Sequence, residues 1–282
     1  MRPLAPPQFV GAIRTMSRCY ERISRLYQHV SRWTATVLRL GIDLIYPRCC
    51  PLCSRSVPCS AAPTACDICP DCRQVLLLQP PARCTRCSYP LGQFTHSDLT
   101  RGCIHCDGRF AFDSLVCLGV YQGALRDACL LAKIGQNEHL SAALAELLVE
   151  SQGDRLADLQ ADWIVSVPCH WSQTWRRETH PTPIVAAVLS QRLGIPVNRK
   201  CLRKVRRTRL QKRLTLLERK HNLKGAFQLS RKHAKPLADS SVILVDDVLT
   251  TGTTANAAVH ALRSAGVRHL TVAVLAQGVS RR

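Results

Sequence analysis

Two adjacent carboxylates stand directly after an apolar run in VILVDDVLTTGTT, residues 242–254. The apolar residues 242–245 predict a central strand, which would leave Asp246 and Asp247 at its carboxyl end. The Thr- and Gly-rich residues 250–254 would then lead into a helix. A glycine-permitted turn, Thr hydroxyls and the positive end of a helix dipole together bind phosphate, and paired acids suit sugar hydroxyls or hydrated Mg²⁺. This stretch therefore predicts a phosphate site beside a carboxylate pair.

The same stretch has a plainer interpretation, in which Asp and Thr end a strand and cap a helix. One cap needs one such residue, whereas seven of the nine residues 246–254 are Asp, Thr or Gly. We therefore favour ligand binding. The loop is not a Walker A loop, because G-x₄-G-K-[ST] occurs nowhere in the chain.

The second group of residues with chemical potential is formed by cysteines, of which the chain has 16. Eight of them form C-x₂-C pairs arranged as C-x₂-C-x₁₅-C-x₂-C written twice, and each member of the second set follows its counterpart by 34 residues. A two-residue gap aims two thiolates at one ion, and two such turns complete a tetrahedral Zn²⁺ site. We expect two structural Cys₄ zinc ribbons, with the ligands Cys50, Cys53, Cys69, Cys72, Cys84, Cys87, Cys103 and Cys106.

Alternatives to this ligand set stay open at the level of sequence. A disulfide framework would need an oxidising compartment, which nothing else in the chain supports. Four thiolates leave no open position for water, so a catalytic zinc is disfavoured. Other residues that could serve as ligands are Cys49, Cys59, Cys66 and His105, but neither Cys49 nor Cys66 has a partner at the 34-residue offset.

After residue 107 the sequence alternates apolar strand patterns with helical ones. We expect strands at 115–121, 163–168, 195–197, 241–245 and 270–275, and helices at 137–150, 181–193 and 254–265. Gly194 and Gly266 stand where helix C-caps are expected. Continuous apolar strands alternating with helices predict an α/β fold with a mainly parallel sheet covered on both faces, which binds ligands at the carboxyl ends of its strands.

The formal charge of +20 favours phosphate-bearing partners. Residues 199–235 hold 15 Lys or Arg and one acid, so +14 of this charge lies in 37 residues. The first 48 residues carry eight Arg and two acids, and residues 1–45 are interpreted as a basic extension with an amphipathic helix. No signal peptide and no apolar run long enough for a membrane span are found, so a cytoplasmic protein with reduced thiols is expected.

The stretch at 242–254 closely resembles the PRPP-binding motif of type I phosphoribosyltransferases. The segments YQGALRDACLLAKIGQ (121–136), DWIVSVPCH (162–170) and RKVRRTRLQKRLTLLERKHNLKGAFQL (203–229) look like consecutive blocks of the ComF/GntX family. LIYPRCCPLC resembles the start of that family, which is competence-associated and pairs an N-terminal zinc module with a phosphoribosyltransferase domain. Lys133 resembles a recurring lysine of the family, although a surface lysine whose stem packs on apolar residues explains it equally well.

This resemblance implies roles for individual residues. Asp246 and Asp247 would hold the ribose hydroxyls of PRPP, which would bind together with Mg²⁺. The 5′-phosphate would be held by Thr250, Thr251, Gly252, Thr253 and Thr254. The pyrophosphate would be held by Ser166, Pro168, Cys169 and His170, and by Arg206, Arg207 and Arg209 from a loop that closes over it. After the Val-Pro turn at 167–168 the family usually shows an R-G-[FY]-N stretch. This chain instead has Arg177, Glu178, Thr179 and His180, so the glycine and the Asn amide are absent and a contact on the pyrophosphate side is altered.

Taken together, these features predict a double zinc ribbon at residues 46–110 and a phosphoribosyltransferase-like domain at 111–282. The expected function is PRPP binding linked to DNA uptake and nucleotide use, with transfer of phosphoribosyl to a nitrogen acceptor and release of Mg-pyrophosphate if the protein turns over. The alternative is a non-catalytic adaptor of competence that keeps a vestigial phosphate site and binds single-stranded DNA or proteins. The acceptor and the oligomeric state are not written in the sequence.

Overall fold

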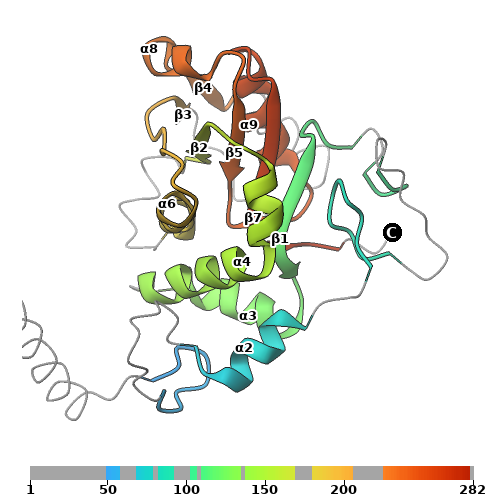
Figure 1. The fold of residues 1–282 in the computed structure, drawn as a ribbon, viewed down its shortest axis with the longest axis vertical. Helices are drawn as coiled ribbons and strands as arrows, with labels where there is room; N and C mark the ends of the chain where they lie inside the picture. The colour runs from blue at the N-terminus through green and yellow to red at the C-terminus, as the bar shows by residue number, and fades with distance from the viewer. Residues whose placement is uncertain are drawn as a thin grey trace, which may run out of the picture.

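A five-stranded parallel sheet organises the computed structural model, which describes residues 49–57, 68–78, 82–91, 102–106, 109–134, 137–168, 180–205 and 225–279. The strand order is β1 (Ser114–Val120), β7 (His269–Gln277), β5 (Ser241–Val245) and β2 (Trp163–Ser166), and β6 (Val248–Leu249) also pairs with β7. All of these pairings are parallel. Figure 1 shows β7 between β1 and β5. The expected α/β fold with a mainly parallel sheet is confirmed.

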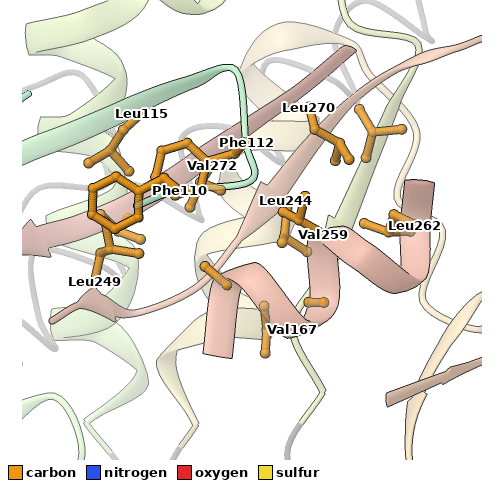
Figure 2. Packing of buried hydrophobic residues seen from close by; sticks show 14 of the residues in the cluster. Phe110, Phe112, Leu115, Val167, Leu244, Leu249, Val259, Leu262, Leu270 and Val272 are labelled. Carbon is orange, nitrogen blue, oxygen red and sulfur yellow. The ribbon is translucent and has the colours of Figure 1, made fainter. Parts of the chain in front are cut away.

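Helices cover both faces of this sheet and divide its core in two. One face packs against α3 (Gly123–Leu131), α4 (Glu138–Asp158) and α6 (Pro181–Leu193). The other face packs against α9 (Thr253–Arg263), and Figure 2 shows Val259 and Leu262 of this helix with Leu244, Leu270 and Val272 of the strands. Buried side chains line both faces, which explains why the strands are apolar runs rather than alternating ones.

The elements outside the sheet are short. The helix α2 (Pro70–Leu77) packs beside α3 (Figure 1). An antiparallel pair joins β3 (Leu202–Lys204) to β4 (Phe227–Leu229), and α8 (Arg231–Ala234) and the 3₁₀ turn η2 (Lys235–Leu237) follow it. The pair β3–β4 contacts α9 and contributes Leu202 and Phe227 to the core on that side of the sheet.

The two cysteine clusters lie on opposite faces of the sheet. The first cluster, Cys50, Cys53, Cys69 and Cys72, packs through its buried members with α3 and α4. The second cluster, Cys84, Cys87, Cys103 and Cys106, packs with Phe110, Phe112 and Leu115 on the side of α9. Figure 1 shows α2 of the first cluster next to α3, with the turns of the second cluster on the far side of β1.

Several predicted boundaries agree with the structure. The strand at 241–245 and the helix at 181–193 have the bounds expected from the sequence. Gly194 is the C-cap of α6 with φ of 69°, and Gly266 has φ of 82° in the turn that follows α9. Both glycines therefore adopt the left-handed conformation that ends helices.

Other predicted boundaries were wrong. The helix expected to end at residue 150 continues to Asp158, because Leu156 is fully buried and Arg155 donates to the carbonyls of Thr85 and Leu115. The strand expected at 195–197 is a single parallel bridge between Val197 and Ile164. No helix in the described part of the chain is long and apolar enough to cross a membrane.

Candidate functional site

The carboxylate pair, Asp246 and Asp247, lies between β5 and β6 at the carboxyl end of the sheet. Val245 is opposite Ala273 and Val248 is opposite Ala276, so the strand keeps its register with β7 across the pair. The Asp246 N–H donates to the Ala273 carbonyl at 3.0 Å, and the Asp247 carbonyl accepts from Leu275 N–H at 3.0 Å. The sheet therefore fixes the backbone that carries both carboxylates.

Local hydrogen bonds orient the two side chains. Asp246 Oδ1 accepts from the Asp247 N–H at 2.9 Å, and Asp247 Oδ1 accepts from the Val248 N–H at 2.7 Å. Each carboxylate thus uses one oxygen on the backbone and keeps the second for another group. For Asp247 that group is Lys133, which follows α3 and whose Nζ lies 2.5 Å from Asp247 Oδ2.

Lys133 is therefore part of the site rather than an ordinary surface lysine. The sequence left both interpretations open, because Lys133 and Asp247 are far apart in the chain. Burial lowers the pKa of Lys133, but the charge of Asp247, its hydrogen bond to the lysine and the charges of Asp246 and Tyr121 together outweigh this effect, so that the pKa is raised overall. The lysine is charged at neutral pH and brings a cation to the carboxylate pair.

The Asp246 carboxyl has a perturbed proton affinity. Burial raises its pKa to about 8, and the negative charge of Asp247 acts in the same direction, while Lys133 acts against both. A carboxyl that is neutral near pH 7 both donates and accepts hydrogen bonds, and a bound cation or a polar ligand would favour its ionised form. The pair can therefore take up or release a proton when a ligand binds.

The loop predicted from the sequence to bind phosphate, residues 250–254 and called the phosphate loop below, runs from β6 into α9. Its Gly252 is the N-cap of α9 with φ of 76°, and no side chain forms the cap hydrogen bond there. The hydroxyls of Thr251 and Thr253 lie 2.8 Å apart. The first-turn N–H groups of α9 and the threonine hydroxyls thus converge beside the carboxylate pair, which is the arrangement that binds phosphate at a helix N-terminus.

The structure places only some of the expected pyrophosphate residues. Ser166 is the last residue of β2, and the Val167 N–H donates to the Val245 carbonyl at 2.9 Å. Ser166 and Pro168 therefore lie at the same end of the sheet as the carboxylate pair. Other predicted residues lie outside the described part of the chain, namely Cys169, His170, Arg206, Arg207 and Arg209. The basic extension at 1–45, Cys59, Cys66 and residues 177–179 lie outside it as well.

The segment of residues 199–235, called the basic segment below, is described only at its two ends, 199–205 and 225–235. Val205 N–H donates to the Ala226 carbonyl at 2.9 Å, next to the β3–β4 pair. Residues 206–224 therefore leave and rejoin the described structure at neighbouring points on the α9 side of the sheet.

Both cysteine clusters fit a tetrahedral metal ion. In each, the four Sγ atoms lie within 4.8 Å of one another. The Sγ separations include 3.5 Å for Cys53 and Cys69, 3.9 Å for Cys84 and Cys106, and 3.7 Å for Cys87 and Cys103. Zinc–sulfur bonds of about 2.3 Å in a tetrahedron place sulfurs about 3.8 Å apart, so each cluster has the size and donors for Zn²⁺.

The clusters also bear on two of the alternative ligands. Cys49 is exposed and is not a member of either group among the described residues. The His105 ring stacks on Tyr89 with ring centroids 3.8 Å apart, and the second group holds four cysteines without it.

The position before the Cys103–Cys106 pair requires glycine. Gly102 has φ of 84°, and a Cβ there would collide with Cys106 Sγ.

Comparison with known proteins agrees with this geometry. Residues 183–282 match the model of the phosphoribosyl transferase domain. Competence protein F of Haemophilus influenzae is 29% identical over 222 residues, covering 74% of this chain and 96% of the relative. The DNA utilization protein YhgH of Escherichia coli K12 is 31% identical over 175 residues, covering 61% of this chain and 73% of the relative. The chain belongs to the ComF family. This ComF-family protein thus contains a phosphoribosyltransferase domain.

Two solved structures show limited similarity to this ComF-family protein. Orotate phosphoribosyltransferase from Aeropyrum pernix is 26% identical, with a TM-score of 0.31, over 50% of this chain and 60% of that enzyme. The glutamine PRPP amidotransferase from B. subtilis is 23% identical, with a TM-score of 0.31, over 48% of this chain and 26% of that enzyme.

Sequence reasoning missed three residues that surround the phosphate loop of this ComF-family protein. Asn256 in α9 is hydrogen-bonded to residues 109 and 111, and Phe110 packs against Gly252. The third, Arg109, lies over the Phe110 ring at 5.1 Å from its centroid. The only signal in the sequence is the RFAF stretch directly after the second cysteine cluster, which contains two phenylalanines that stack on one another.

Proposed function

We propose that this protein binds PRPP, together with Mg²⁺, at the carboxyl edge of its sheet. The single observation that carries the proposal is the position of the carboxylate pair, in register between β5 and β6, directly before a phosphate loop at the N-terminus of α9. A phosphorylated ribose needs hydrogen-bond acceptors for two hydroxyls and donors for one phosphate a few ångströms away. These adjoining groups supply both.

In this proposal each residue has a defined role. Asp246 and Asp247 accept hydrogen bonds from the ribose hydroxyls, and the N–H groups and hydroxyls of residues 250–254 bind the 5′-phosphate. Ser166 to His170 bind the pyrophosphate, with Arg206, Arg207 and Arg209 approaching from the basic segment. Lys133 adds a cation that offsets the repulsion between the carboxylate pair and an anionic ligand.

The supported chemistry, if the protein turns over, is phosphoribosyl transfer. A nitrogen of the acceptor forms a bond to ribose C1′, and the bond from C1′ to the pyrophosphate oxygen breaks with its electron pair going to that oxygen. Pyrophosphate leaves, and a proton carried by the attacking nitrogen is released to solvent. Mg²⁺ would neutralise charge on the leaving pyrophosphate. The basic segment and Lys133 are suited to stabilise the same charge, which develops in the transition state.

The test is calorimetric titration of the metal-loaded full chain with PRPP, with and without Mg²⁺. We expect Mg²⁺-dependent binding that Asp247→Asn reduces at least about 100-fold, because a ribose acceptor and the charge paired with Lys133 are both lost. Asp162→Asn is the matched control, since Asp162 Oδ2 accepts from Ser241 N–H at 2.8 Å at the opposite end of β5. Absence of binding by the intact protein would rule out the proposal.

A second candidate is a non-catalytic adaptor in DNA uptake that binds single-stranded DNA or partner proteins. It is favoured by the net charge of +14 in residues 199–235. The β3–β4 pair lies within this segment and brings residues 204 and 227 together at the base of its most basic part. The names of the protein's relatives, Competence protein F and DNA utilization protein, support a role in handling DNA under either candidate. Asp247→Asn would leave DNA binding unchanged unless the two sites overlap.

The remaining expectations belong to the same proposal. We assign residues 46–110 to a double zinc ribbon and 111–282 to the phosphoribosyltransferase-like domain, with two Zn²⁺ in the cysteine clusters. Cysteines that bind metal must stay reduced, which favours the cytoplasm.

A further inference from the structure

The side chain of Asn256, in the helix that directly follows the phosphate loop, is bonded to the segment between the second cysteine cluster and β1. Asn256 lies in the first turn of α9, and its own N–H donates to the Gly252 carbonyl at 2.8 Å. Its side-chain Oδ1 accepts from the Ala111 N–H at 3.0 Å, and its Nδ2 donates to the Arg109 carbonyl at 2.9 Å. Both polar ends of this side chain are therefore used to hold residues 109–112, called the connector below.

Phe110 of the connector lies directly against the loop glycine. A Cβ at Gly252 would collide with the Phe110 ring, and only 8% of the Phe110 surface is exposed. The ring stacks on Phe112 with centroids 4.8 Å apart, and Figure 2 shows both rings among the core side chains Leu115 and Leu249. Because Gly252 also has φ of 76°, this position requires glycine for its conformation and for the close approach of the ring.

The connector is in turn held by the second cysteine cluster. Arg86, which lies between Cys84 and Cys87, donates to the carbonyls of Phe110 and Phe112 at 3.2 and 3.4 Å. At the start of the connector, Arg109 N–H donates to the Cys106 carbonyl at 3.2 Å. The turns that carry the cysteines are therefore hydrogen-bonded to the connector, and the connector is hydrogen-bonded to the first turn of α9 and packs against Gly252 of the phosphate loop.

The first cluster has a different neighbourhood. Its buried members pack with α3 and α4 on the opposite face of the sheet, and Arg73 of α2 forms an ion pair with Glu150 of α4. The start of α9 is instead tied to the connector, through the two side-chain hydrogen bonds of Asn256. The two clusters should therefore differ in their effect on the loop.

We propose that the second cysteine cluster positions the phosphate loop, with Asn256 and Phe110 as the positioning residues that transmit its order. Metal in the second cluster fixes the turns at 84–87 and 103–106, these turns fix the connector, and the connector sets the place of Gly252 and of the N-terminus of α9. This inference rests on the proposed function only where it concerns PRPP. The order of the loop itself is a property of the protein without ligand.

The experiment measures hydrogen–deuterium exchange of the amides of residues 250–258 in the full-length, metal-loaded protein without PRPP. Asn256→Ala should raise exchange in this stretch on the order of tenfold while the protein keeps both metal ions, because the loop loses two hydrogen bonds to the connector. Phe110→Leu should act in the same direction. Asn198→Ala is the matched control, since Asn198 also joins two segments, donating to the His233 carbonyl and accepting from Cys201 N–H.

The metal dependence is tested by comparing Cys106→Ser with Cys53→Ser. Loss of metal from the second cluster should raise exchange at 250–258, and loss from the first cluster should leave it near the wild-type level. Equal exchange in wild type and Asn256→Ala would overturn the proposal, and so would an equal effect of the two cysteine variants. If Cys106→Ser does not fold, Asn256→Ala and Phe110→Leu decide the question with the cluster intact.

PRPP titration of the same variants separates this inference from the proposed function. If PRPP binds, Asn256→Ala should weaken binding about tenfold, whereas Asn198→Ala should lower the melting temperature without changing affinity. If PRPP does not bind the intact protein, the proposed function fails, and the exchange measurements still decide whether the second cluster positions the loop.

Discussion

Lys133 Nζ and Asp247 Oδ2 lie 2.5 Å apart, and this contact joins the segment after α3 to the carboxylate pair between β5 and β6. The lysine side chain is 40% exposed and that of Asp247 is 22% exposed, so solvent reaches both partners. An ion pair of this kind contributes about 1 kcal/mol or less to stability. Its importance is therefore electrostatic, because it sets the charge that a ligand meets.

The first prediction concerns the removal of this cation. Lys133→Met should weaken PRPP binding about tenfold, since an anionic ligand then approaches two carboxylates without a compensating charge. The measurement is calorimetric titration at neutral pH, with Arg268→Met as the control because Arg268 is an exposed cation outside the basic segment. Tighter binding by Lys133→Met would show instead that the lysine competes with ribose for Asp247.

The second prediction follows from the raised pKa of Asp246, about 8, in the folded protein. Between the ordinary value of 3.8 and this value, the folded state holds a proton that the unfolded state has released. This group therefore contributes stability at acid pH, and the contribution is lost as the pH rises to about 8. The charged and titratable groups that influence the site are Asp247, Lys133, Tyr121 and Cys129.

Thermal unfolding of wild type and Asp246→Asn, measured between about pH 5 and about pH 8.5, checks this sign. Asp246→Asn should gain stability relative to wild type as the pH rises, because an amide does not ionise. Binding of PRPP with Mg²⁺ should release a proton near pH 7, visible as a binding enthalpy that depends on the ionisation enthalpy of the buffer. A stability difference that stays constant with pH would contradict the assignment.

The third prediction concerns metal content. Elemental analysis should give about two Zn²⁺ per chain, one for each Cys₄ cluster. Cys50→Ser should reduce this number to about one, because Cys50 is 1% exposed and belongs to the first group of sulfurs. Cys49→Ser should leave about two, since Cys49 is exposed and outside that group. Equal loss in the two variants would mean that the ligand set is wrong.

The fourth prediction addresses DNA. If the basic segment binds single-stranded DNA, affinity should fall steeply with salt, and each cation reversed within residues 203–213 that contacts a phosphate should reduce the slope of log K against log salt by about 0.7. Arg268→Glu is the control, because Arg268 is an exposed cation beyond this segment. Unchanged slopes after reversal would exclude the segment as the DNA site.

Part of this architecture could be predicted because its signals are local. The bounds of β5 followed from an apolar run that ends at two carboxylates, and those of α6 from a proline at its start and a glycine at its end. The carboxylate pair and the phosphate loop were visible for the same reason, since their residues are adjacent in the chain. The paired C-x₂-C spacing likewise predicted which eight cysteines gather in two groups.

The remainder could not be predicted because it depends on contacts between distant segments. The strands β3 and β4 have three residues each and are stabilised by each other and by α9, so neither gives a clear pattern alone. Lys133 is more than 100 residues from its partner Asp247 in the sequence. Asn256 is equally distant from the Arg109 carbonyl and the Ala111 N–H that it contacts. Side chains of this kind look like ordinary surface residues until the fold brings their partners to them.

The central place of β7 has a consequence for biosynthesis. β1, β5 and β6 all pair with β7, yet β7 follows every one of them in the chain. The ribosome therefore synthesises the other strands before the strand that joins them. More than 140 residues are added after β1 before its partner β7 begins. The cysteine clusters are translated before β1 and can take up metal early, so the nascent chain would acquire its metal centres before its sheet.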